Sequence, residues 1–438
     1  MFEETFGFTW QVAQTILVNY YGWVLFAGVF IWIGYRLWLE RQIIKYLSTI
    51  KWVYLEARVD QLNERSPVAM EQVFTSMHAM MQFFSMGEKW SGRIPLWMSA
   101  EIVSIGGRVS YMFKLPERYR NLLESAVFAQ YPKAEIREIQ DYLGNLPRNW
   151  DLDTEFDLWG TQFIKRAFTG FPIRTYRQDD QFFEHPEQKT TIDALSGVIE
   201  AMSNIMPHEL MAIQIVIKPT GDDWKPGAYE QVAKMKGIPP KAKPADWFEK
   251  IFLNLPGAAL EAILTGIGMA GEPIEKKEEK VQPLTQTMTD AEKMVIDSVV
   301  AGLGKLSFEV KMRLMYLAPK DKFSKGMRVP EILGTLKNFD NPQLNGLRPD
   351  IKITTDASFK LFQSLEQPYL DHKIKTRKNK FLRWFKDRAH WEGSGWTIMN
   401  TEELATLFHF PQAPNARVSQ VEKVQTVKSA PPIDLPIG

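Results

Sequence analysis

The chain has 438 residues, an apolar fraction of 45% and a formal net charge of +1. This length accommodates about two or three domains, and the apolar fraction is that of a globular protein rather than of a polytopic membrane protein. The small net charge excludes a global electrostatic field that would attract nucleic acid, so any such binding must come from a local patch. The absence of cysteine excludes disulfides, thiolate metal sites, iron–sulfur clusters and cysteine nucleophiles.

The N-terminal region predicts a single transmembrane helix, preceded by a segment at residues 1–19. No charged residue occurs between Thr5 and Tyr35, and residues 20–39 form an apolar stretch of about the twenty residues that a helix needs to cross a bilayer. A cleaved signal peptide is the alternative, but the sequence has neither a basic start nor a small-residue cleavage site. The basic residues that flank the apolar stretch, Arg36, Arg41 and Lys45, all lie at its C-terminal end. The positive-inside rule therefore predicts a plasma (inner) membrane protein with its N-terminus outside and its body in the cytoplasm.

Residues 51–142 predict a first module with the element order βαββαβ. The stretch WVYLEARV alternates apolar and polar residues with the period of a half-buried strand, and Ser66 and Pro67 suit the start of the helix that follows. Gly106 and Gly107 provide a two-residue turn that lets the strands around it form a tight hairpin. A second helix and the strand AEIREI complete the unit, which has the order of the ferredoxin-like fold.

Residues 160–350 predict a second α+β module of the same ferredoxin-like kind. Its expected strands are FPIRTY, LMAIQIVIKP and FEVKMRLMYL, with helices at 192–205 and near 330–338. Proline-rich and highly charged sequence at about 221–288 interrupts the module and predicts a helical and loop insertion. The sequence TDAE at Thr289 is a capping box that opens the helix after the insertion.

The C-terminal region predicts a helical segment at 356–410 and a flexible, proline-containing tail at 411–438. The stretch NTEELATLFHFP at residues 400–411 predicts a helix that ends at a proline, and the tail after it has the composition of an extended connector. The fold class predicted for the whole chain is therefore α+β. It comprises one N-terminal transmembrane helix, two ferredoxin-like modules with the second interrupted, and the C-terminal tail.

Motifs that would carry chemistry are missing from the sequence, so we predict no catalytic residue, no cofactor site and no metal site. The nearest string to a phosphate-binding loop is AGLGKLS at residues 301–307, but it lacks the leading glycine and has Leu306 after the lysine. Gly302 and Gly304 are interpreted as helix-ending residues. The histidines are scattered without the spacing of a zinc motif, and His409 is interpreted as a packed histidine.

One basic segment, residues 372–388, has two interpretations that the sequence leaves open. In the first it is an amphipathic helix docked by Phe381, Trp384 and Phe385, with its charges in solvent. In the second it is a strip that contacts DNA phosphates or anionic lipid. The candidate contact residues are Lys373, Lys375, Arg377, Lys378, Lys380, Arg383, Lys386 and Arg388.

Several strings together resemble the N-terminal, non-motor region of membrane-anchored HerA/FtsK-type ATPases associated with type IV secretion and conjugative DNA transfer. In that family a segment like NTEELATLFHFP leads through a proline-containing linker into the P-loop motor. This sequence ends at Gly438, where the motor would begin, so the resemblance implies a motor that is encoded separately or is missing from this sequence. The matching strings are LEARVDQLNERSPVAMEQVFTSMHAM, FAQYPKAEIREIQDYL, FPIRTY, AIQIVIKP, LSFEVKMRLMYLAP, NTEELATLFHFP and SAPPIDLP.

The resemblance implies a non-catalytic, membrane-anchored component of a type IV secretion-like machine for DNA or protein transfer, which docks or orients a separate P-loop ATPase. A hexameric ATPase ring would impose matching copies of this chain, so a homo-oligomer is expected from the resemblance. One alternative is a membrane-associated nucleic-acid-binding module that uses residues 372–388. The other is a membrane-anchored enzyme whose site is assembled from residues distant in sequence, such as Glu71, Asp141 or His208.

Overall fold

The computed structural model describes residues 22–60, 63, 65–151, 154–177, 193–236, 288–356 and 363–411. The predictions for residues 1–19, for 237–287 of the insertion and for 412–438 of the tail lie outside the described residues. The described part belongs to two compact units. The body contains the described residues up to Thr169, from Ile173 to Thr220 and from Lys305 onward, and the second unit contains those from 170 to 172 and from 221 to 304.

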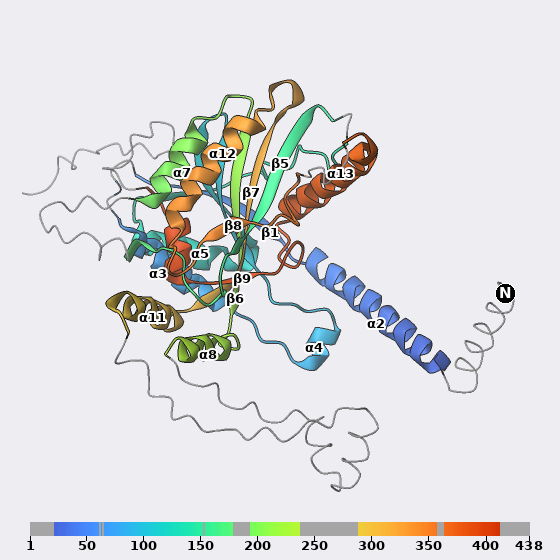
Figure 1. Cartoon of the computed structure of the whole chain (residues 1–438), viewed down its shortest axis with the longest axis horizontal. Helices are drawn as coiled ribbons and strands as arrows, with labels where there is room; N and C mark the ends of the chain where they lie inside the picture. The colour runs from blue at the N-terminus through green and yellow to red at the C-terminus, as the bar shows by residue number, and fades with distance from the viewer. Residues whose placement is uncertain are drawn as a thin grey trace, which may run out of the picture. The chain divides into compact units, whose positions relative to one another are not determined.

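A nine-stranded sheet forms the body, with the strand order β4-β1-β3-β2-β6-β7-β5-β8 and β9 paired with β7 (Figure 1). Every pairing in this sheet is antiparallel. The strands are β1 (Trp52–Arg58), β2 (Met98–Ile105), β3 (Arg108–Pro116), β4 (Glu135–Glu138), β5 (Phe156–Lys165), β6 (Leu210–Thr220), β7 (Ser307–Pro319), β8 (Leu347–Pro349) and β9 (Thr397–Asn400). The α+β class is therefore as predicted.

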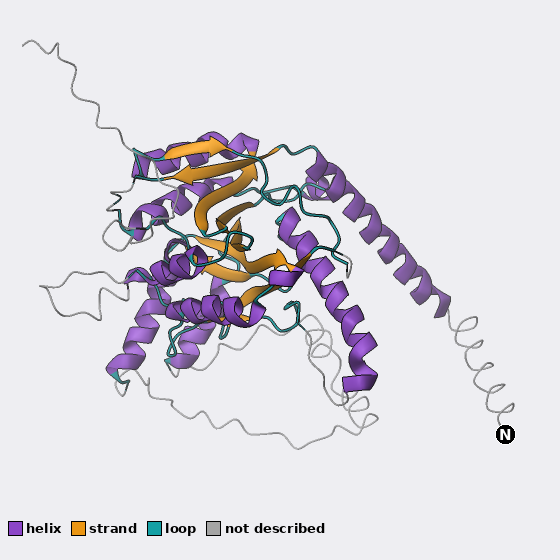
Figure 2. Ribbon diagram, turned by 90° about the horizontal axis from the view of Figure 1, so that it is seen from above, coloured by secondary structure: helices purple, strands orange, loops and turns teal. Residues whose placement is uncertain are grey.

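The helices of the body lie on both sides of this sheet (Figure 2). In chain order the described α-helices of the body are α2 (Gly22–Ser48), α3 (Pro67–Met77), α4 (Met86–Trp90), α5 (Arg120–Gln130), α7 (Ala194–Ser203), α12 (Lys325–Leu336), α13 (Gln363–Asp387) and α14 (Thr401–Leu407). One face of the sheet packs its apolar side chains with those of α3, α5, α7, α12 and α14. The other face carries a smaller apolar cluster into which α13 inserts its side chains.

The sheet consists of two halves with the same internal order. The elements β1-α3-β2-β3-α5-β4 give the strand order β4-β1-β3-β2, and β5-α7-β6-β7-α12-β8 give β8-β5-β7-β6. Both are the order of the ferredoxin-like unit. Strands β2 and β6 pair from Met98 opposite Ile217 to Ile105 opposite Leu210, and this pairing makes the two halves one continuous sheet.

The hairpin predicted at Gly106 and Gly107 is present between β2 and β3. The backbone φ angles of the two glycines are 60° and 86°. Positive φ at both central residues is the requirement of a type I′ turn, whose twist matches that of the flanking strands. A side chain at either position would be strained, so the two glycines fix the register of this hairpin.

The strand predicted at FPIRTY is wrong, and the second half begins earlier, with β5 at Phe156. Pro172 has no amide hydrogen for a strand ladder. The next amides bond outside the sheet: Ile173 N donates to Glu403 Oε1 at 3.0 Å, and Arg174 N donates to the Phe339 carbonyl at 3.0 Å. These partners hold the segment against the C-terminal part of the chain instead of in a ladder.

The stretch NTEELATLFHFP forms α14 and then enters the core. Asn400 and Glu403 make the capping box of the helix, with Glu403 N donating to Asn400 Oδ1 at 2.9 Å. Beyond the helix, Phe408 and Phe410 are 0% exposed. Asn63 Nδ2 donates to the carbonyl of Pro411, the last described residue, at 3.1 Å. The helix therefore brings the chain back onto the first half of the sheet.

The second unit contains α8 (Lys225–Met235) and α11 (Asp290–Leu303). The predicted capping box opens α11, with Glu292 N donating to Thr289 Oγ1 at 3.3 Å. The helix ends before Gly304, which agrees with the interpretation of the AGLGKLS string as a helix end. The sequence placed this helix in the second module, whereas the structure assigns it to the second unit.

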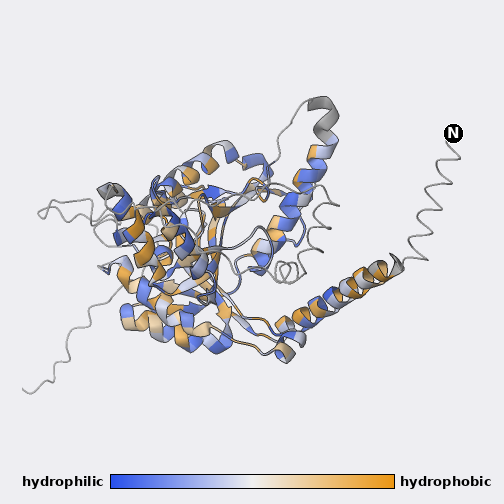
Figure 3. Cartoon of the chain, turned by 60° about the horizontal axis from the view of Figure 1, so that its bottom comes forward, coloured by the Kyte–Doolittle hydropathy of each residue, from blue (hydrophilic) through white to orange (hydrophobic). Residues whose placement is uncertain are grey.

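The predicted transmembrane helix at 20–39 is wrong. Among the described residues no helix is both long and apolar enough to span a bilayer. Within α2 the charged residues Arg36, Glu40, Arg41 and Lys45 follow the apolar part, and hydrophilic residues alternate with apolar ones toward its C-terminal end (Figure 3). The membrane keywords and the predicted inner-membrane localisation, with the N-terminus outside, depended on this span and are not supported.

Candidate functional site

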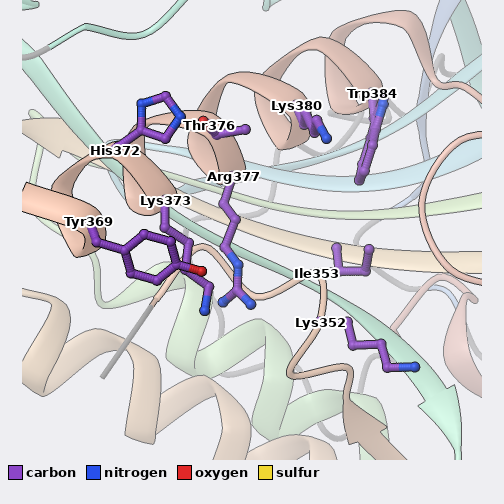
Figure 4. Close-up of a pocket in the computed structure, with 9 residues that line it drawn as sticks. All are labelled: Lys352, Ile353, Tyr369, His372, Lys373, Thr376, Arg377, Lys380 and Trp384. Carbon is purple, nitrogen blue, oxygen red and sulfur yellow. The ribbon is translucent and has the colours of Figure 1, made fainter. Parts of the chain in front are cut away.

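A pocket with a volume of about 430 Å³ lies between α13 and the loop that follows β8. Tyr369, Lys373 and Arg377 of α13 extend toward this loop (Figure 4). None of the described residues that line the pocket is acidic, and cationic and aromatic side chains dominate. The lining residues are Lys352, Ile353, Tyr369, His372, Lys373, Thr376, Arg377, Lys380 and Trp384.

An apolar stripe docks helix α13 on the sheet. Phe381, Leu382 and Phe385 are 0% exposed and pack into the apolar cluster on the second face of the sheet. Gly160 on β5 makes room for this contact, because a Cβ atom at Gly160 would lie 2.1 Å from the Phe381 ring. The first interpretation named Trp384 as a third docking residue, but its side chain is only half-buried and lines the pocket.

Several of the predicted basic contact residues bond within the body. Lys378 is buried, pairs with Asp157 and lies 4.2 Å from the centroid of the Trp150 ring. Lys375 pairs with Asp151 at 2.7 Å, and Lys386 donates to the carbonyl of Leu146. These lysines tie α13 to β5 and to the segment before it, so their charges are already partly compensated.

Arg377 is fixed by the loop but still lines the pocket. Its Nη1 donates to the carbonyls of Thr354, at 3.0 Å, and Asp356. A guanidinium has five N–H donors, and these bonds use only one nitrogen. The side chain therefore has donors left for an anion while its position is set by two main-chain acceptors.

Three lysines of the pocket have no carboxylate partner among the described residues, namely Lys352, Lys373 and Lys380. Lys352 and Lys380 are exposed, and Lys373 Nζ lies 5.5 Å from the centroid of the Tyr369 ring. The tyrosine ring is 65% exposed. Like charges in a pocket that also has an exposed aromatic ring suit a ligand that has both negative charge and flat rings.

Arg388, the last predicted contact residue, lies in the protein interior. Its side chain is 1% exposed and pairs with Glu101 at 2.9 Å and with Asp141 at 2.6 Å. Burial alone would raise the pKa of Glu101, but Arg388 and hydrogen bonds from Ser99 and Tyr142 reverse this and lower it. Arg388 is thus part of a buried ion-pair network and is not accessible to a nucleic acid.

The same network fixes the end of α13. Gln214 Nε2 donates to the carbonyl of Phe385 at 3.0 Å, and Arg313 donates to those of Trp384 and Ala389 at 3.2 and 2.5 Å. The last carbonyls of a helix have no partner within the helix, so these donors from β6 and β7 satisfy them. The sheet therefore positions the C-terminal half of the helix through both apolar and polar contacts.

The residues proposed for an enzyme site do not share a cluster. Glu71 on α3 bonds to Lys305 at 2.7 Å and to the hydroxyl of Tyr176, whereas Asp141 bonds to Arg388. His208 lies before β6 and, among the described residues, shares no bonding partner with Glu71 or Asp141. No group of three or more His, Asp or Glu side chains in the described ranges is placed to hold a metal ion.

His409 is buried and packed, in agreement with its interpretation from the sequence. Its Nδ1 lies 2.8 Å from the carbonyl of Ala405, and its Nε2 lies 3.1 Å from Asp193 Oδ1. Asp193 is also the N-cap of α7. The histidine therefore links the end of α14 to the start of α7.

The sequence missed Lys352 and Tyr369 as members of the site. Lys352 follows β8 and carries no motif of its own, and only the packing of its loop against α13 brings it to the pocket. Tyr369 lies one turn before the basic run, where the spacing i, i+4 to Lys373 was the available signal.

No family model matches the chain, and no curated protein matches it. The resemblance to HerA/FtsK-associated regions therefore stays a prediction.

Proposed function

We propose that this chain is a non-catalytic binding module that holds the sugar–phosphate backbone of single-stranded nucleic acid in the pocket beside α13. Its biological setting would be a DNA-transfer machine of the kind that the sequence resembles. The observation that supports this function is the pocket itself, where Lys352, Lys373 and Lys380 lack carboxylate partners among the described residues and Lys373 lies beside an exposed tyrosine.

A single strand suits this pocket better than a duplex. Proteins that bind single strands combine a positively charged groove with aromatic rings on which bases stack, and Tyr369 and Trp384 supply such rings. The lysines project from one helix and one loop, which gives a short row of cations rather than a surface that follows a double helix. Binding should therefore be weak, tolerant of sequence and sensitive to salt.

The test is the salt dependence of binding to a fluorescent oligothymidylate, followed by anisotropy. Contacts from the three lysines predict a slope of log Kobs against log salt of roughly −2, at about −0.7 per phosphate. The variant Lys373→Ser/Lys380→Ser should bind at least ~10-fold more weakly at low salt, with a slope smaller by about 1.4. A charge-matched control, Lys89→Ser/Lys337→Ser, removes exposed lysines elsewhere in the body and should bind like the wild type. Equal binding and equal slopes for the two variants would sink the proposal.

A second part of the proposal is a separate P-loop ATPase as partner, recruited by the segment after Pro411. What supports it is the fixed exit of the chain: Phe410 is buried and Asn63 holds the carbonyl of Pro411. A pull-down from native cells with the full chain and with a chain lacking residues 412–438 tests this part. Recovery of a P-loop ATPase only with the full chain is expected. Recovery of no ATPase, or of the same ATPase with both chains, counts against it.

A further inference from the structure

A groove of about 920 Å³, which has Trp384 in common with the pocket described above, lies between the C-terminal half of α2 and the body. On one side it is lined by Leu39, Ile43 and Leu47 of α2. On the other side are tryptophans: the ring centroid of Trp97 lies 5.1 Å from that of Trp52 and 4.8 Å from that of Trp391. The walls of the groove are therefore largely apolar and aromatic. Its volume is large enough for a small organic molecule.

Lys114 lines this groove from β3 and forms no ion pair with a described residue. Its side chain is 9% exposed, and Nζ makes no hydrogen bond or ion pair with any described residue. Instead Nζ lies 5.1 Å from the centroid of the Trp52 ring and 5.3 Å from that of Tyr54. A buried ammonium that lacks a carboxylate is costly to the folded state, so a charge of the opposite sign in the groove would be favourable.

The groove also carries cations at its edge. Arg383, one of the predicted contact residues, is exposed and faces this groove rather than the pocket beside α13. Arg148 lies nearby, 3.9 Å from Asp387. The acidic lining residues Glu40, Asp387 and Glu392 show that the groove is not uniformly positive. The most deeply placed charge is nevertheless the lysine, and this determines which end of a ligand would enter first.

We propose that this groove binds an amphipathic organic anion, a medium-chain carboxylate, with its head on Lys114 and its apolar chain between the tryptophans and α2. The carboxylate supplies the counterion that Lys114 lacks. The chain covers Ile43, Leu47 and the tryptophan rings. A purely apolar ligand would leave the ammonium buried without a partner, and a metal cation would be repelled by it. This inference does not depend on nucleic-acid binding at α13.

Burial, together with the nearby Arg388, lowers the pKa of Lys114 to about 8. The other ionisable groups that face it are Tyr54, Glu101, Asp141 and Asp387. Near pH 8.5 this lysine is therefore protonated in only a fraction of the free protein molecules. A bound carboxylate favours the charged form of the lysine. Binding should take up a proton from the buffer.

The experiment is calorimetric titration of the full chain with decanoate at pH 8.5, in two buffers of different ionisation enthalpy. We expect one decanoate per chain, proton uptake on binding, and at least ~10-fold weaker binding of decanol, which has the same chain without the charge. Lys114→Met should lose decanoate binding and proton uptake, whereas Lys114→Arg should bind without proton uptake. The control Lys89→Met should behave like the wild type.

A second variant, Ile43→Glu, leaves Lys114 in place and adds a carboxylate to the apolar wall of the groove. It should abolish binding while circular dichroism remains native, which protects the test against a Lys114 variant that fails to fold. The proposal is overturned by no saturable binding of decanoate to the wild type. It is equally overturned by equal binding of decanoate and decanol, or by decanoate binding that Lys114→Met leaves intact.

Discussion

Arg388 combines an unfavourable backbone with a favourable side chain. It is the residue after α13, its φ is 50°, and it is the one non-glycine residue with positive φ in the described ranges. Its amide bonds to the Phe385 carbonyl and the next amide bonds to that of Trp384, which is the Schellman arrangement that ends many helices with glycine. An L-residue costs roughly 1–2 kcal/mol in this conformation. The ion pairs with Glu101 and Asp141 explain why arginine occupies the position.

Arg388→Gly should therefore destabilise the body even though glycine suits the backbone better. The substitution leaves Glu101, which is 1% exposed, without its cationic partner. Removing one member of a buried ion pair costs about 3–5 kcal/mol, which exceeds the relief of backbone strain. Urea denaturation measures the change in the free energy of unfolding. A stability equal to or above that of the wild type would show that the pair contributes little. The double variant Glu101→Gln/Arg388→Gly should recover part of the loss, since no buried charge is left unpaired at position 101.

The lowered pKa of Lys114 predicts that the folded protein becomes more stable at alkaline pH. Burial first, and then repulsion from Arg388, lowers its folded pKa from 10.5 to about 8. Between these two values the unfolded chain binds more protons than the folded chain, so the free energy of unfolding increases as pH rises from about 8 to 10.5. Lys114→Met lacks this contribution and should be more stable than the wild type at pH 7, by roughly 3 kcal/mol. Urea denaturation at several pH values compares the two proteins, and a constant difference between them would contradict the assignment.

At the scale of elements, a close apolar contact of α13 with the sheet is that of Phe381 with Gly160. Gly160→Ala places a methyl group where the Phe381 ring lies, so the helix must shift. Overpacking of this kind costs about 1–3 kcal/mol. Hydrogen exchange of the α13 amides should increase together with the loss in stability. The control Gly334→Ala lies in α12 with no atom within 4 Å of the new methyl group, and it should be neutral or stabilising by about 0.4–1 kcal/mol. Equal effects of the two substitutions would argue against tight docking of α13.

The sequence predicted the existence and the apolar stripe of α13 but not which of its charges are available. Helical spacing is a local property, so Phe381 and Phe385 could be assigned correctly. The partners of Lys375 and Lys378 are Asp151 and Asp157, more than two hundred residues earlier in the chain. No local pattern reports such a pairing, and the composition of the segment therefore overstated its free charge.

The same limit explains the strand assigned wrongly at FPIRTY. Its alternation of apolar and polar residues fits a strand, but the amides of Ile173 and Arg174 meet acceptors from Glu403 and Phe339. Strand propensity is decided by tertiary context more than helix propensity is. The capping boxes at Thr289 and Asn400 show the converse, because a cap needs only residues three positions apart.

For the whole molecule, the repeated βαββαβ pattern was visible in the sequence, but the junction of the halves was not. Strands β2 and β6 are each the outer strand of one ferredoxin-like half, and each becomes a central strand through their pairing. Both are buried on both faces: the burial of β2 is continuous from Met98 to Ser104, although Ser99 and Glu101 are polar. Buried strands with few polar residues indicate burial on two sides without naming the neighbour. Pairing removes two exposed edges, which would otherwise be open to association with other chains.

The contacts of Phe408 predict that the two halves of the body unfold together. It follows β9 and α14, and β9 is anchored on β7 of the second half. Its ring, however, packs edge-on against Phe74, Tyr111 and Phe113 of the first half, with centroid distances of 6.2, 5.5 and 5.2 Å. Phe408→Ala opens a cavity at this contact and should lower the free energy of unfolding by about 3–5 kcal/mol.

If the halves are one cooperative unit, the urea unfolding transition of the Phe408→Ala variant moves to a lower midpoint and stays a single step. Far-UV circular dichroism and tryptophan fluorescence, followed during urea denaturation, should then give coincident curves for the wild type and the variant. The control Phe83→Ala removes a ring that is 82% exposed and should leave the midpoint unchanged. Two separate transitions in the variant would mean that the first half unfolds alone. In that case the β2–β6 pairing joins two independently stable modules, and the return of the C-terminal segment to the first half would be what makes the wild-type body cooperative.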